Sequence, residues 1–197
     1  MPRLTQRSRD ARRQQVVDAA RRCFARSGFR ATSMQDIFAE SGLSAGAVYG
    51  YFASKEELVG TIVEEVVTEI VTGVEAALDA EEPATPDEVI RGVFDVLDRQ
   101  DGAAATLAVQ VWAEALHNPA LGELVAAGYR TLRERFTRLV RHYQRAGLLD
   151  QAAKADDVAR FLTTLGPAFV FQRALLDGVD AQTFHKGLMG FRPPAGR

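Results

Sequence analysis

The sequence has very little cysteine: one residue, Cys23, among 197. A single thiol cannot form a disulfide within the chain, so a disulfide scaffold is excluded and a reducing, cytoplasmic setting is expected. We interpret Cys23 as a small buried hydrophobe, with a redox sensor as the alternative. No apolar stretch reaches the ~18–20 residues that cross a bilayer, and no apolar segment follows the basic N-terminus as in a secretory signal. The sequence therefore predicts no membrane partner.

Patterns that carry catalysis or metal binding are also lacking. The three histidines, His117, His142 and His185, are scattered and do not have the spacing of metal ligands. There is no glycine-rich phosphate loop and no nucleophile elbow. We therefore expect a protein that is not an enzyme and that has no metal site and no cofactor.

Charge is distributed unevenly along the chain, although the formal net charge is only −2. Residues 1–55 contain ten Lys or Arg against four Asp or Glu, a balance of +6, and the remainder has a balance of −8. A basic N-terminal part on an acidic body suggests a module that binds a polyanion, attached to something else. A chance fluctuation in surface charge is the alternative.

Helical periodicity and capping residues recur throughout, so the expected fold class is all-α with about nine helices. A flexible arm is expected over 1–8, a linker over 80–85, a kink at Pro167 and a disordered tail after 190. We place a DNA-binding domain at 1–53 and a larger helical domain for ligand binding and dimerisation at 54–197. The expected helices are 9–27, 33–40, 44–51, 54–79, 86–100, 103–117, 120–146, 155–177 and 180–190.

Two of these short helices flank the turn 41–43, which contains Gly42, and this arrangement is typical of a helix-turn-helix. Ile37, Leu43 and Val48 are spaced to face one another and the first helix. Small residues at the start of the second short helix would let it approach DNA closely, with free N–H groups that attract phosphate. The expected exposed face consists of Gln35, Ser44, Ala45, Gly46 and Tyr49.

Lys55 lies in the first turn of the helix expected at 54–79, where the helix dipole disfavours a cation. A nearby phosphate would offset that cost. A solvated lysine paired with Glu56 or Glu57 is the alternative, and both interpretations stay open.

The stretch TSMQDIFAESGLSAGAVYGYFASKEEL, residues 32–58, resembles the TetR/AcrR family of bacterial regulators. That family has a Thr/Ser cap, an Asp-Ile pair, a Gly turn, a Ser-x-Gly recognition helix and a Phe-x-x-Lys-Glu-x-Leu segment. Phe38 departs from the alanine that is usual after the isoleucine. The resemblance implies DNA contacts from Ser33, Gln35, Ser44, Tyr49, Tyr51 and Lys55, with Gln35, Ala45 and Gly46 closest to base edges.

The body is rich in aromatic residues on its expected helices. The resemblance implies that its helices surround an inducer cavity, and that the last two long helices form a homodimer interface to which Phe161, Leu165 and Leu176 contribute apolar area. An acidic, aromatic body suits a cationic or neutral apolar compound. The candidate pocket residues are Phe94, Gln110, Trp112, His117, Phe136 and Phe169.

The predicted function is that of a TetR-like regulator, a repressor that binds a near-palindromic operator in double-stranded DNA as a homodimer. A small-molecule inducer would release it. The alternatives are a transcriptional activator and a ligand-independent DNA-binding protein of the same fold.

Overall fold

The computed structural model describes residues 6–80, 84–100 and 102–190, and within these ranges the chain forms nine α-helices. The all-α prediction is confirmed, and the helix ends agree with the expected ones to within a few residues. The helices are α1 (Gln6–Ala31), α2 (Met34–Ser41), α3 (Ala45–Tyr49), α4 (Lys55–Asp79), α5 (Pro86–Asp98), α6 (Gly102–Ala115), α7 (Pro119–Arg145), α8 (Ala155–Leu175) and α9 (Ala181–Met189).

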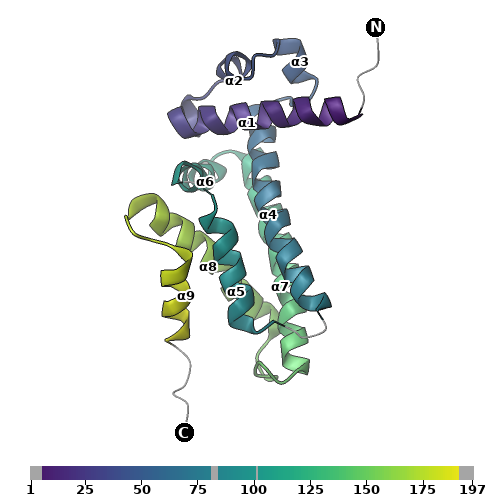
Figure 1. Ribbon diagram of the computed structural model, residues 1–197, viewed down its shortest axis with the longest axis vertical. Helices are drawn as coiled ribbons and strands as arrows, with labels where there is room; N and C mark the ends of the chain where they lie inside the picture. Colours follow the sequence, from purple (N-terminus) through teal and green to yellow (C-terminus); the bar gives the residue numbers. More distant parts are fainter. Residues whose placement is uncertain (1–5, 81–83, 101, 191–197) are drawn as a thin grey trace.

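Figure 1 shows α1–α3 stacked at one end of the molecule, and we call these three helices the head. Helices α5–α9 form the body, and α4 runs from beneath the head along the body beside α7. Two ion pairs from α7 to Glu75 fix this pairing: Arg135 at 3.2 Å and Arg138 at 3.1 Å. Helix α4 is thus the physical link between the two parts.

Helix boundaries follow local chemistry. Ser54 caps α4 by accepting a hydrogen bond from the N–H of Glu57. Thr85 and Glu88 form a capping box at the start of α5, with Pro86 in the first turn. Asn118 caps α7 through bonds from two backbone N–H groups. Each of these signals lies within four residues of the helix end that it fixes, so it can be identified in the sequence.

Helix α1 extends past its expected end at Ser27, but Gly28 interrupts its geometry with φ 75° and ψ 169°. Such a conformation is essentially restricted to glycine. The N–H of Phe29, freed by this break, donates to Oε1 of Gln110 on α6 at 2.8 Å. The break therefore joins the head to the body.

The buried side chains form two cores. The first fills the head with Phe24, Ile37 and Val48 among others, but it also includes Leu107 of α6 and Leu121 of α7. The second lies between α4 and the five helices of the body, α5–α9. The head core thus includes residues from both sides of the domain boundary that we predicted at residue 53. The division into two domains at that residue stays a prediction.

Some expectations fall outside the described ranges. Of the predicted arm, Arg3 lies outside them, whereas Arg7 already belongs to α1. Residues 81–83 of the predicted linker and the predicted tail also lie outside them. Within the part of the chain that the structure describes, no helix is both long enough and apolar enough to cross a bilayer.

Candidate DNA-binding face and ligand cavity

Helix α2 begins at a complete capping box. Ser33 Oγ accepts a hydrogen bond from the N–H of Asp36 at 3.3 Å, and the Asp36 carboxylate accepts from the N–H of Ser33 at 2.8 Å. The Ser33 hydroxyl also donates to that carboxylate at 2.6 Å. These bonds hold the pKa of Asp36 below its usual value. The start of α2 is therefore fixed by its own residues.

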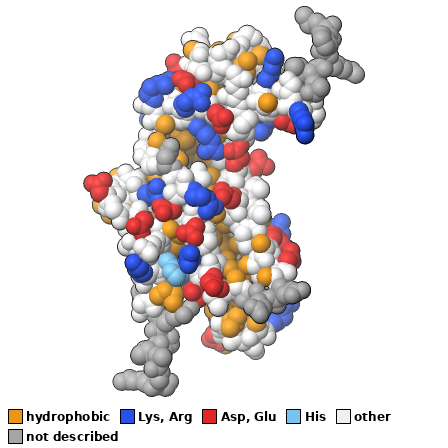
Figure 2. Space-filling model, viewed as in Figure 1, with side chains coloured by type: hydrophobic (Ala, Val, Ile, Leu, Met, Phe, Trp, Pro, Cys, Tyr) orange, Lys and Arg blue, Asp and Glu red, His pale blue; other side chains and the backbone are white. Residues whose placement is uncertain are grey.

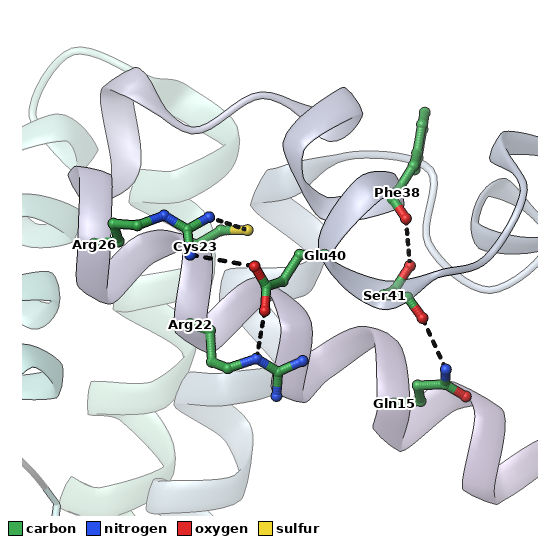
Figure 3. A network of polar contacts seen from close by, with 7 residues as sticks. All are labelled: Gln15, Arg22, Cys23, Arg26, Phe38, Glu40 and Ser41. Carbon is green, nitrogen blue, oxygen red and sulfur yellow. Dashed lines mark hydrogen bonds and ion pairs between the residues drawn. The ribbon is translucent and has the colours of Figure 1, made fainter.

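The other end of α2 is tied to α1 by polar contacts (Figure 3). Gln15 donates to the backbone oxygen of Ser41 at 2.8 Å. Glu40 accepts from Arg22 at 2.7 Å and from Arg26 at 3.2 Å, and these bonds lower the pKa of Glu40. The C-terminal end of α2 is thus fixed on α1 just before the turn.

Cys23 lies beneath these contacts. It is buried, with Arg26 donating to its sulfur at 3.7 Å, and burial raises the pKa of the thiol. A thiol in this state is a poor nucleophile, because the thiolate is the reactive form. The interpretation of Cys23 as a packed apolar residue agrees with this environment.

Helix α3 is short and is held by one buried side chain and one aromatic contact. Ser44 caps it by accepting from the N–H of Ala47, and Val48 is fully buried in the head core. Tyr49 is 53% exposed, and its ring meets that of Phe38 edge to face, with centroids 5.2 Å apart. The unusual Phe38 therefore supports the exposed aromatic side chain of α3.

Six of the eight predicted DNA-contacting residues lie exposed on this side of the head. Tyr51 differs, because it is half-buried and packs against the head core. A Cβ added at Gly46 would meet no atom within 4 Å, so packing within the chain does not require a glycine there. The exposed six are Ser33, Gln35, Ser44, Ala45, Gly46 and Tyr49.

Lys55 does not project into solvent as either of our interpretations required. Its ammonium donates to the backbone oxygens of Phe29 at 3.0 Å, Arg30 at 3.3 Å and Thr32 at 3.2 Å. It also lies 4.5 Å from the centroid of the Phe29 ring. An ammonium has three N–H donors, and here all three are used. Lys55 therefore stabilises the carbonyl end of α1, and the direct phosphate contact stays a prediction.

Between the head and the body lies a cavity of about 470 Å³. This volume is within the usual range for small-molecule sites. Helices α1 and α4–α8 contribute to its wall, and on the face drawn in Figure 2 hydrophobic side chains reach the surface between head and body. Most of the lining is apolar, including Val59, Ile62, Val66, Ile70, Val93, Leu97, Val111, Leu132 and Val170.

Two of the six predicted pocket residues, Trp112 and Phe136, line this cavity. Phe94 and Phe169 instead pack on each other in the second core, with centroids 5.4 Å apart. Gln110 points to the Phe29 N–H.

His117, the sixth predicted pocket residue, is exposed beyond the end of α6. With Phe94, Phe169 and Gln110, it is one of four that do not line the cavity. Helical spacing places a residue on a face but does not say which faces surround a space, so it could not distinguish these four from the two that line the cavity.

The prediction missed six polar or charged lining residues: Arg21, Arg22, Arg99, Gln100, Tyr129 and Thr163. Burial raises the pKa of the Tyr129 phenol, which stays protonated at neutral pH. In the sequence the two arginines of α1 look like ordinary members of a basic module. No local signal distinguishes an arginine that points into a cavity from one that points into solvent.

Helix α8 has an exposed face of its own. Residues 161, 164, 168, 171 and 175 are exposed and follow one another at intervals of three and four. Phe161 is 61% exposed, Phe171 50% and Leu175 64%. Large apolar side chains aligned along one face of a helix are typical of a surface that packs on a partner helix.

The geometry defines a class of protein: a helix-turn-helix head joined by one long helix to a helical body with an apolar cavity. Two family models match the chain: the bacterial regulatory proteins of the tetR family over residues 16–62, and the C-terminal domain of BetI-type transcriptional repressors over residues 84–185.

Individual relatives match over most of their length. The HTH-type transcriptional regulator YfiR of Bacillus subtilis is 28% identical, over 88% of this chain and 85% of its own. The nicotine-responsive repressor HdnoR of Paenarthrobacter nicotinovorans is 27% identical, over 88% and 84%. The solved structure of Salmonella enterica GusR is 26% identical and superposes with a TM-score of 0.77, over 96% and 98%.

The chain belongs to the TetR family of helix-turn-helix transcriptional regulators. This is a family of DNA-binding proteins and not of enzymes. The prediction of the family, made from residues 32–58, is confirmed.

Proposed function

We propose that this chain is a repressor that binds a near-palindromic operator as a homodimer and is released by a small molecule. The observation that carries the proposal is the continuity of α4. Its first turns, with Leu58, belong to the head core, and its later turns, with Val66 and Ile70, line the cavity. A ligand that shifts α4 would therefore change the position of the head.

The DNA contacts are proposed on the exposed face of α2 and α3. Gln35, Ala45 and Gly46 would lie nearest to base edges, and Ser33, Ser44 and Tyr49 would bind phosphates. Lys55 would act indirectly, by holding the end of α1. Control by a ligand is supported by the cavity, and also by HdnoR, a relative that is described as nicotine-responsive.

Dimerisation is proposed through the exposed face of α8, with α9 beside it. A two-fold dimer presents two recognition helices to successive turns of the major groove, and this explains why the operator should be near-palindromic. Phe161→Glu should place a charge in this interface and prevent dimerisation. Light scattering after gel filtration should then give the mass of one chain. The same change at Leu116, which is 81% exposed at the end of α6, should leave the dimer intact.

DNA binding is tested by fluorescence anisotropy with DNA from around the chain's own gene and with a scrambled duplex, at about 50 and 200 mM salt. Specific binding that persists at the higher salt is expected, with loss in Tyr49→Ala. Leu148→Ala, which alters an exposed side chain of the body, is the matched control. Equal and strongly salt-dependent binding to both duplexes would contradict an operator near that gene.

A further inference from the structure

The charged side chains on the described part of the cavity wall are all positive. Arg21 and Arg22 of α1 and Arg99 at the end of α5 line the cavity, and none of the described lining residues is Asp or Glu. The rest of the wall is apolar or aromatic, apart from Gln100 and Thr163. A charged group is favoured in such a space only where an opposite charge meets it.

Two of these arginines are held by neighbouring turns of α4. Arg21 binds Glu65 at 2.5 Å, and Arg99 binds Glu69, four residues further on. Residues four apart on a helix lie one above the other, so the two guanidinium groups reach adjacent turns. Neither carboxylate lines the cavity; both lie on a separate surface groove along α4.

We propose that the cavity takes an elongated apolar ligand with one anionic group, and that this group binds Arg21 and Arg99 in competition with Glu65 and Glu69. The inference rests on the proposed function, because it names the class of the inducer. It replaces the cationic or neutral compound that the acidic composition of the body suggested. The overall charge of a domain does not determine the charge of its cavity wall.

A cationic ligand is disfavoured for a specific reason. The aromatic rings of Trp112, Tyr129 and Phe136 could each attract a cation through their faces. No carboxylate is present on the described wall to meet such a cation, because the glutamates that pair with Arg21, Arg22 and Arg99 do not line the cavity. An anion meets guanidinium groups whose forked donors match a carboxylate.

This competition would also couple binding of the anion to the position of the head. The bond between Arg21 and Glu65 joins α1 to α4, with the two side chains 32% and 39% exposed. An anion that takes Arg21 from Glu65 would remove this link and leave the head freer to move on α4. Linkage requires the converse as well: operator DNA should weaken binding of the anion by the same factor.

The test uses Trp112, the single tryptophan of the chain, whose fluorescence reports directly on the cavity. The full-length protein is titrated without DNA with decanoate, decanol and decyltrimethylammonium, which share one chain length and differ in charge. Decanoate should bind about tenfold more tightly than either of the others, as expected for one charge-assisted contact. Tighter binding of the cation, or no decanoate binding below about 1 mM, would overturn the proposal.

Three variants locate the anion. Arg21→Gln should bind decanoate no better than decanol, whereas Glu65→Gln should bind decanoate several-fold more tightly, because the competing carboxylate is gone. Arg138→Gln, which breaks a pair to Glu75 of α4 outside the cavity, is the matched control and should behave as wild type. Unchanged decanoate affinity in both Arg21→Gln and Glu65→Gln would refute the assignment.

The outcome is separable from that of the proposed function. Fluorescence measures the ligand with no DNA present, and anisotropy measures the operator with no ligand. If the protein shows no specific operator binding but prefers decanoate, the proposed repressor function is refuted and the proposed anion site is supported. If it binds the operator specifically but does not prefer the anion, the proposed anion site is refuted and the proposed DNA binding is supported.

Discussion

The head and the body solve different packing problems. In the head, Val16, Val17, Ile37 and Val48 are fully buried, and each short helix is fixed by a cap at its start. The long helices of the body, together with α1 and α4, surround a cavity of about 470 Å³ that apolar side chains line without filling. A rigid head maintains the shape that meets DNA, whereas a hollow body can change when a ligand occupies it.

The largest expected effect tests this contrast between a filled head and a hollow body. Phe24→Ala in the head should lower the free energy of unfolding by about 3–5 kcal/mol, because it leaves a void in a close-packed core. Trp112→Ala in the body should cost under about 2 kcal/mol, because this half-buried ring already borders empty space. Urea denaturation of both variants checks the ranking, and equal losses would show that the head and the body are equally well packed.

The junction between the two parts should be the next most sensitive place. Gly28→Ala should cost about 2 kcal/mol, since a side chain is strained at φ 75° and its Cβ would lie 2.7 Å from Oε1 of Gln110. Gln110→Ala in the same chain should recover only the part of the loss that is due to the clash. Thermal melts of the single and double variants measure that part, and full recovery would show that the backbone conformation costs nothing.

Lys55→Met should lower stability by about 1–2 kcal/mol, because three backbone oxygens at the end of α1 lose their donor. The slope of log affinity for operator DNA against log salt should stay unchanged, since we propose that this ammonium acts through the end of α1 and not on a phosphate. Chemical denaturation and anisotropy at several salt concentrations measure the two quantities. A salt slope reduced by about one in Lys55→Met would show that Lys55 does contact a phosphate.

The smallest effect lies in the body and depends on pH. Tyr143 is buried and donates to the backbone oxygen of Ala84 at 2.6 Å, and burial, with Glu88 and Asp87 nearby, raises its pKa to about 12. Since the unfolded pKa is about 10, this group stabilises the fold below pH 10, and the contribution is lost as pH rises toward 12.

Tyr143→Phe should therefore be less stable at neutral pH by about 1 kcal/mol, the value of the lost hydrogen bond. Its stability should fall less steeply than that of wild type between pH 10 and 12. Denaturation of both proteins across this range gives the difference directly. Parallel curves would contradict the role of the phenol.

The all-α fold, most helix ends and the family could be predicted from the sequence alone. These features depend on short-range chemistry: Ser33 and Asp36 fix the start of α2 within four residues, and Gly42 with φ 66° ends it. The predicted exposure of Gln35, Ser44 and Tyr49 agrees with the structure for the same reason, because a helix of known register has a known outer face.

The contacts of the side chains at the junction between head and body could be learned only from the tertiary structure. Lys55 finds its partners 23 to 26 residues away, and Gln110 reaches across 81 residues to Phe29. Arg21 lines a cavity only because α1 crosses α4 at that point (Figure 1). A cavity is bounded by helices that are distant in the sequence, and periodicity within one helix carries no information about the space between several.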